Sequence, residues 1–203
     1  KKKKKKKNSN FQLMSNPQSN PNELEEQLRV ASAVGDLQTV EQILLSDTIN
    51  PNSFGKDQYF NPLMHATLRG HLDVIKALFN DPRIRVNLEN MDGLTPFLFA
   101  CQQGKMDVLF YYLEDGRVNI NKISKDGTSA IGLLVTNGHK EAIRWLMASG
   151  RRVIVDVEWN GETPFEIAKK KKYFKVLELL ENYDQDEGET RKKIRDELGL
   201  KGL

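Results

Sequence analysis

The stretch from Thr95 to Leu113, TPFLFACQQGKMDVLFYYL, decides the fold. A Thr followed by Pro is a strong helix start, because Thr caps free backbone N–H groups and Pro fits the first helical position. Gly104 then breaks the helical pattern. Beyond it, apolar residues recur at 108, 109, 112 and 113, which is the spacing of a helix with one buried face. The stretch therefore predicts two short helices joined at a glycine.

The same plan recurs along the chain at a fixed distance. Further copies begin at Asn61, Ser129 and Thr163, so each copy starts 34 residues after the one before it. An earlier, looser copy runs from Leu24 to Leu45 and is offset by one residue at its glycine. A constant period of this length predicts repeats in which each helix pair buries its apolar face against its neighbours.

Short connecting segments follow the second helix of each copy. They contain Val-Asn pairs, as at Val86-Asn87, and end in Asp92-Gly93, Asp126-Gly127 or Asn160-Gly161. Such pairs favour tight hairpin turns, because both residues tolerate positive φ.

This pattern resembles the ankyrin repeat, and the resemblance covers residues 23–182. It implies an all-α fold, an ankyrin-repeat α-solenoid of stacked helix-turn-helix pairs with short β-hairpin tips. The family's His after Thr-Pro-Leu is absent, since that position holds Met64, Leu98, Gly132 and Glu166. Lys172 replaces the glycine between the helices of the last copy. We therefore expect the repeats to be unequal in stability.

The domain organisation follows from the repeat positions. We expect an ankyrin-repeat domain over 23–183, with repeats at about 23–56, 57–90, 91–124, 125–158 and 159–183. A short capping helix is expected over 184–203, where Asp186 is a suitable cap. Residues 1–22 are almost all Lys, Asn, Ser, Gln and Pro, a composition that predicts a disordered tail.

Charge, cysteine content and hydrophobicity bear on nucleic-acid binding, on the cellular compartment and on membrane insertion. The chain has 31 basic and 28 acidic residues, and Lys1–Lys7 supply seven of the positive charges. Without that run the remainder is mildly acidic, so the net charge of +3 is a poor argument for nucleic-acid binding. One cysteine allows no internal disulfide, which fits an intracellular protein. No apolar run approaches membrane-spanning length.

No catalytic or metal-binding motif is present, and we expect no enzyme activity, no metal and no cofactor. His71 and His139 occupy the same repeat position, but two repeats separate them, roughly 20 Å at the usual helix spacing, so they cannot share a metal. Cys101 stands where the family has a small core residue, and we expect a buried, unreactive thiol.

The resemblance implies a concave groove formed by the hairpin tips and the exposed side of the first helices. These positions differ between copies, whereas the core positions stay aliphatic. The candidate partner-binding residues are Tyr59, Phe60, Leu68, Arg69, Met91, Asp92, Leu94, Gln102, Gln103, Lys125, Asp126, Thr136, Asn137, Trp159, Asn160, Lys170 and Lys171.

Two of these candidates have structural alternatives. Trp159 is either an exposed interface residue or a side chain that folds back onto the neighbouring tip. Lys169–Lys172 form either a basic end to the groove, suited to an acidic partner segment, or a polar cap on the last repeat.

These patterns predict a protein-interaction scaffold or adaptor, an intracellular and cytoplasmic monomer that binds a protein partner and no small-molecule substrate. One alternative is the targeting module of a larger signalling protein or enzyme whose catalytic domain lies outside this chain. A second is binding of nucleic acid or anionic membrane through Lys1–Lys7, a run that could also direct nuclear entry.

Overall fold

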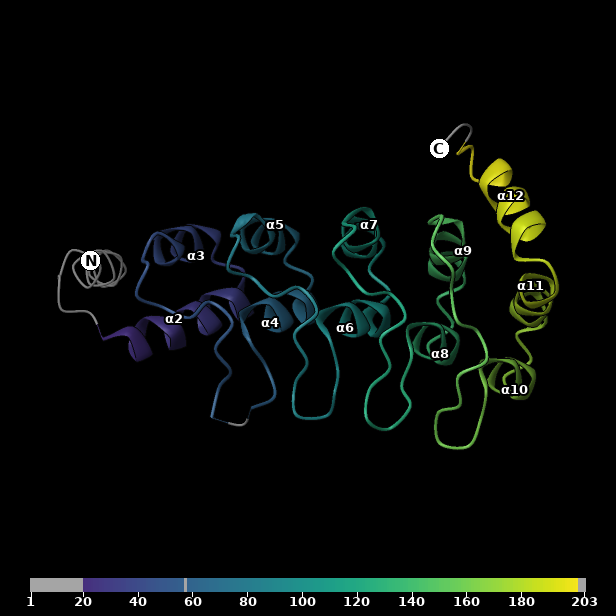
Figure 1. The fold of residues 1–203 in the computed structure, drawn as a ribbon, viewed down its shortest axis with the longest axis horizontal. Coiled ribbons are helices and arrows are strands. Elements are labelled where there is room, and N and C mark those ends of the chain that lie inside the picture. The colour runs from purple at the N-terminus through teal and green to yellow at the C-terminus, as the bar shows by residue number, and fades with distance from the viewer. Residues whose placement is uncertain (1–19, 57, 201–203) are drawn as a thin grey trace, which may run out of the picture. The chain divides into compact units, whose positions relative to one another are not determined.

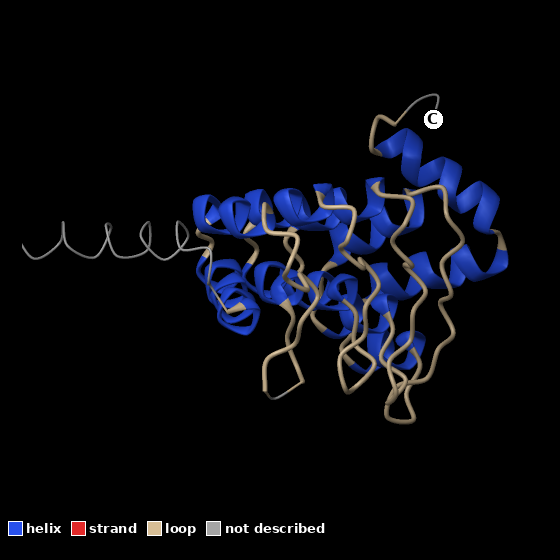
Figure 2. Ribbon diagram, turned by 60° about the vertical axis from the view of Figure 1, so that its left-hand side comes forward, coloured by secondary structure: helices blue, strands red, loops and turns tan. Residues whose placement is uncertain are grey.

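The computed structural model describes residues 20–56 and 58–200. Lys1–Lys7 and most of the expected tail lie outside these ranges. Within them the chain forms eleven α-helices and an isolated two-residue bridge, and Figure 2 shows only helices and loops. The chain divides into two compact units, the first ending at Arg85 and the second beginning at Val86.

Unit 1 contains the first two repeats. Its helices are α2 (Pro21–Val34), α3 (Leu37–Leu44), α4 (Pro62–Arg69) and α5 (Leu72–Asn80). Helix α2 packs on α4 and α3 packs on α5, so the two helix pairs lie one against the other (Figure 1). The side chains that fill the space between them are fully buried and include Leu28, Ile43, Leu63, Ile75 and Leu78.

Unit 2 contains the remaining three repeats and a final helix. Its helices are α6 (Pro96–Gln103), α7 (Met106–Glu114), α8 (Ala130–Thr136), α9 (Lys140–Ala148), α10 (Pro164–Lys170), α11 (Phe174–Gln185) and α12 (Glu187–Glu197). The first helices α6, α8 and α10 pack in sequence, and α7 packs on α9. Helix α12 lies in the segment where a capping helix is expected, and it packs against α9 and α11 through the buried Ile194.

The first helices begin where the sequence predicts. Asn61, Thr95, Ser129 and Thr163 are N-caps whose side chains accept backbone N–H groups. Thr163 and Glu166 form a reciprocal capping box, so the glutamate at the family's His position supports its own helix.

Helix α2 begins earlier than the expected domain boundary at residue 23. The Asn20 side chain accepts the N–H of Asn22, and Pro21 occupies the first helical position. Residues 20–22, which composition alone assigns to a disordered tail, are therefore the cap and first turn of the helix. Their Asn-Pro-Asn sequence is a capping signal that the surrounding polar composition hides.

A left-handed residue separates the two helices of every repeat. Gly35, Gly70, Gly104 and Gly138 have φ between +62° and +78°, and Lys172 takes the same conformation at +58°. The turn therefore requires positive φ whatever the residue, and Lys172 adopts it despite the steric cost of its Cβ atom.

The side chain just after this turn packs on the glycine of the preceding repeat. The His71 ring lies over Gly35 and the His139 ring over Gly104, where an added Cβ would come within 2.6 and 2.4 Å of the imidazole. The Nε2 atoms of these histidines lie 3.2 Å from the carbonyl oxygens of Ala33 and Gln102. Both histidines therefore have a structural role between successive repeats.

Polar side chains also join successive repeats. The Arg151 guanidinium donates to the carbonyls of Val118 and Leu113 in the preceding repeat, at 2.7 and 2.9 Å. The Asn121 amide donates to the Arg152 carbonyl and accepts the Ile154 N–H. Equivalent contacts are made by Arg83 and Asn52 in unit 1, and by Asn87 in unit 2. These bonds satisfy backbone groups that helix ends and extended loops leave free.

The first two tips of unit 2 are three-residue loops, wider than the expected tight turns. At 90–94 and 124–128 two backbone hydrogen bonds close the loop, and of each Asp-Gly pair only the glycine has positive φ. At the last tip both Asn160 and Gly161 have positive φ, and Trp159 and Glu162 exchange two backbone hydrogen bonds. The tight turn therefore forms at Asn160-Gly161, whereas in the other two tips the glycine is the third loop residue and alone takes the left-handed conformation.

We predict that Lys172→Gly stabilises the protein by about 1 kcal/mol, because glycine removes the Cβ clash at positive φ. Lys171 has φ −81°, so Lys171→Gly at the neighbouring position should destabilise it, by up to about 1 kcal/mol. Urea unfolding of the two variants measures both effects, and equal destabilisation by both would contradict a left-handed constraint at 172.

We predict that Gly104→Ala destabilises the protein by about 2 kcal/mol or more, because the methyl group meets both positive φ and the His139 ring. Gly161→Ala shares the positive φ but meets no atom within 4 Å, so it should cost less. Adding His139→Ala should recover part of the Gly104→Ala loss in thermal unfolding. A loss unchanged by His139→Ala would show that the ring contact is unimportant.

Candidate partner-binding surface

The tips of unit 2 are joined into a row by hydrogen bonds. The Lys125 backbone N–H donates to the Asp92 carbonyl at 2.9 Å, and its ammonium donates to the Met91 carbonyl at 2.7 Å. The Trp159 indole N–H donates to Asp126 at 3.2 Å. In Figures 1 and 2 these loops project on the same side of the unit 2 helices. Unit 2 therefore presents a continuous surface of tip residues.

Asp126 is the best-ordered polar side chain of this row. It accepts hydrogen bonds from the hydroxyls of Ser124 and Thr128 and from the Thr128 N–H. These bonds, with that of Trp159, lower the pKa of Asp126 to about 2, and the Ser124 hydroxyl contributes most. The exposed carboxylate of Asp126 thus links its own tip to the tip that carries Trp159.

Trp159 contacts the neighbouring tip rather than projecting freely. It is half-buried, and its indole N–H bonds to Asp126 of the preceding repeat. Of the two alternatives for this residue, the structure therefore shows the one in which it folds back. Its remaining exposed edge still belongs to the surface of the row.

The exposed ends of the first helices lie along the same unit. Gln102 and Gln103 end α6, Thr136 and Asn137 end α8, and Lys170 and Lys171 end α10. The Lys170 ammonium lies 2.8 Å from the Glu162 carboxylate, so one lysine of the basic end is paired with the last tip. Glu162 is not among the seventeen candidates, and a pair eight residues apart is not evident from the sequence alone.

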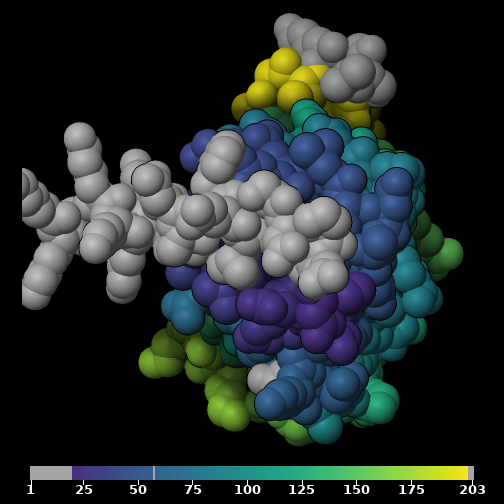
Figure 3. All heavy atoms as spheres, turned by 90° about the vertical axis from the view of Figure 1, so that its left-hand side faces the viewer, coloured from purple at the N-terminus to yellow at the C-terminus, as the bar shows by residue number. Residues whose placement is uncertain are grey.

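Unit 1 carries the other four candidates. Tyr59 and Phe60 form an edge-to-face pair with ring centroids 4.7 Å apart, and Phe60 also contacts His65. Leu68 and Arg69 lie at the end of α4. In the same unit, the outermost helix α2 leaves Val30 and Val34 more than half exposed, and it lies at the surface in Figure 3.

None of the seventeen candidates is buried. Six are half-buried, namely Tyr59, Phe60, Leu68, Leu94, Thr136 and Trp159. The others are exposed, and Met91 stands out among them as an apolar side chain that is 55% accessible. The structure brings the thirteen candidates of unit 2 onto linked tips and adjacent helix ends, and it places the four of unit 1 at one tip and one helix end.

Cys101 and the two histidines considered as metal ligands are not among these candidates. Cys101 is fully buried, and burial raises the pKa of its thiol. In the part of the chain that the structure describes, no cluster of three or more His, Cys, Asp or Glu residues could hold a metal ion. None of the described helices is long and apolar enough to cross a membrane.

Successive helix pairs that stack within each unit, with linked tips in unit 2, define a helical repeat protein. A family model described as ankyrin repeats matches residues 28–122 and 97–190, so this chain belongs to the ankyrin-repeat family. Ankyrin repeats are generally protein–protein interaction modules and are typically non-catalytic. Comparison with curated proteins found no match.

We predict that Asp126 stabilises the folded chain in a pH-dependent manner. Its pKa is lowered from 3.8 to about 2 on folding, so its contribution is complete above pH 3.8 and is lost as the pH falls through about 2. The difference in unfolding free energy between the wild type and Asp126→Asn should therefore shrink between about pH 4 and pH 2.

Urea unfolding at a series of pH values measures this difference. Trp159→Phe removes a minor donor and leaves Ser124 and Thr128 in place, so it should retain most of the effect. A difference between wild type and Asp126→Asn that does not vary with pH would contradict the assignment.

Proposed function

We propose that this protein is a scaffold or adaptor that binds a partner protein through the tip row of unit 2 and the adjoining ends of α6, α8 and α10. The observation that carries the proposal is the linkage of successive tips by backbone and side-chain hydrogen bonds. A surface ordered before binding loses less conformational entropy on association than separate flexible loops would.

The chemistry of the row supports a protein partner. Met91 offers exposed apolar area, Trp159 offers an aromatic edge, and Gln102, Gln103 and Asn137 offer amide groups that can donate and accept hydrogen bonds. Interfaces generally combine an apolar centre with a polar rim of this kind. Enclosure of a small substrate would require a deep apolar pocket, and the row is an open surface instead.

The alternative of a targeting module within a larger signalling protein or enzyme uses the same surface and differs only in what flanks it. A role for Lys1–Lys7 in binding nucleic acid or anionic lipid concerns residues outside the described ranges. We propose an intracellular, cytoplasmic location on the basis of the single buried cysteine, and a monomeric state.

Affinity capture with the full chain, followed by calorimetry with the purified partner, tests the proposal. We predict that Met91→Ala, Lys125→Ala or Trp159→Ala weakens binding, by about 2 kcal/mol at a residue central to the interface. That loss corresponds to about thirtyfold in Kd. Circular dichroism should show an unchanged helical content.

Matched controls lie on the second helices. Glu114 ends α7 and Glu181 lies on α11, and both are exposed. Their substitution by Ala should leave the affinity unchanged. Binding that is weakened by the controls and unaffected at the tips would place the interface on the second-helix face and overturn the proposal.

A further inference from the structure

The turn between α10 and α11 carries an unusual concentration of positive charge. Residues 169–175 read KKKKYFK, with five lysines and no acidic residue. Lys170 is paired with Glu162, but within the described ranges Lys169, Lys171, Lys172 and Lys175 form no ion pair. All five are exposed. We call residues 169–175 the basic turn.

An aromatic side chain stands in the middle of these lysines. Phe174 opens α11 and is 66% exposed, the most accessible aromatic residue in the described chain. Helix α12 packs against α9 and α11 but leaves Phe174, at the start of α11, exposed. The basic turn therefore combines an apolar contact area with a surrounding of unneutralised cations.

The fold itself gains nothing from two of these charges. Lys172 takes the left-handed conformation that glycine supplies in the four preceding repeats. Lys175 occupies the first turn of α11, where the second helices α5, α7 and α9 carry Asp73, Asp107 and Glu141. A positive charge at a helix N-terminus opposes the helix dipole. Residues that break local rules in this way are expected at functional surfaces.

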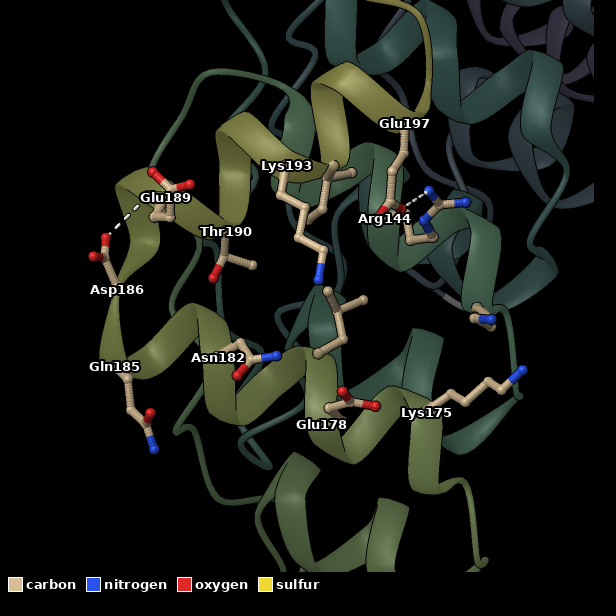
Figure 4. Close-up of a pocket in the computed structure, with 13 residues that line it drawn as sticks. Arg144, Lys175, Glu178, Asn182, Gln185, Asp186, Glu189, Thr190, Lys193 and Glu197 are labelled. Carbon is tan, nitrogen blue, oxygen red and sulfur yellow. Dashed lines mark hydrogen bonds and ion pairs between the residues drawn. The ribbon is translucent and has the colours of Figure 1, made fainter.

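The hollow beside the basic turn offers a weaker alternative. It measures about 600 Å³ and lies among α9, α11 and α12. Figure 4 shows Asp186 and Glu189 at one end, Lys175 at the other, and Arg144 paired with Glu197. Because the hollow is lined by charges of both signs, it does not favour a partner of either charge. The charged residues of the basic turn, in contrast, are all lysines. Lys140, which lines the hollow with Lys175, extends the positive charge at that end.

We propose that the basic turn binds an acidic peptide segment of the partner protein that carries a large apolar side chain. The apolar side chain contacts Phe174, and carboxylates pair with Lys171, Lys172 and Lys175. This inference rests on the proposed function and specifies the chemistry of one part of the partner. Charge complementarity selects the partner and its orientation, and the aromatic contact supplies affinity.

A labelled model peptide of Glu and Asp with a central Leu-Phe pair is a suitable probe. Fluorescence anisotropy at low ionic strength measures its binding to the full chain, in a background where Lys1–Lys7 are replaced by Gln. We expect saturable binding that weakens as salt is added. Replacing the Leu-Phe pair by Ala-Ala should weaken it about tenfold, which is 1.4 kcal/mol.

Variants of the protein assign the site. Phe174→Ala and the pair Lys171→Glu with Lys175→Glu should each weaken binding about tenfold, and Phe174→Ala should abolish the preference for Leu-Phe over Ala-Ala. Lys172→Gly and Lys175→Glu should weaken binding while the unfolding midpoint stays the same or rises. Loss of binding in a more stable protein excludes misfolding as the cause.

The pair Lys76→Glu with Lys192→Glu is the control, since it changes net charge equally on α5 and α12. Equal weakening by this control, or unchanged binding by Phe174→Ala, would overturn the proposal. Binding of phosphatidylserine vesicles or duplex DNA in place of the peptide would also overturn it. Met91→Ala should not affect peptide binding, so the tip-row function can stand if this inference fails.

Discussion

The constraint on which the structure depends is the left-handed residue between the two helices of each repeat. Positive φ at Gly35, Gly70, Gly104 and Gly138 reverses the chain within a few atoms, so that two short helices can pack antiparallel. Helices of eight or nine residues are not stable alone in water, and they persist here because each buries an apolar face. At Gly35, Gly104 and Gly138 the same turn exposes the glycine Cα to the next repeat, whose histidine or tyrosine packs on it. The left-handed residue therefore contributes both to the fold of its own repeat and to the stacking of the next repeat on it.

This arrangement separates the residues that build the fold from those that are free to vary. Aliphatic side chains at fixed repeat positions form the core, while arginine and asparagine side chains satisfy the backbone between repeats. Tip side chains such as Met91 neither fill the core nor form hydrogen bonds to the backbone between repeats. Where tip residues do have structural partners, as with Asp126 and Trp159, those partners belong to the same tip or to an adjacent one. The consequence is a surface that is ordered by the repeat and yet variable in chemistry, which is what a binding module requires.

The 34-residue period predicted the helix starts and the positions of the turns, and the resemblance of the repeated pattern to the ankyrin repeat implied the fold. Caps such as Thr95 and the glycines act within a few residues, so sequence alone identifies them. The link between Trp159 and Asp126 could not be predicted, because it joins residues 33 apart through side-chain orientation. The start of α2 was hidden by the polar composition of residues 1–22, although Asn20 and Pro21 form a capping signal. The exposure of Phe174 could not be predicted from its repeat position, because that position holds a half-buried Met106 in one repeat and an exposed Lys140 in the next.

Hydrogen–deuterium exchange of the full chain, with and without its captured partner, tests the central claim most directly. The claim is that the partner contacts the tips and first-helix ends of unit 2. The account predicts slower exchange in the complex at 91–94, 125–128 and 159–162 and at the ends of α6, α8 and α10. It also predicts unchanged exchange over the outer faces of α7 and α9. Protection confined to α7, α9 and α12, with the tips unchanged, would contradict it.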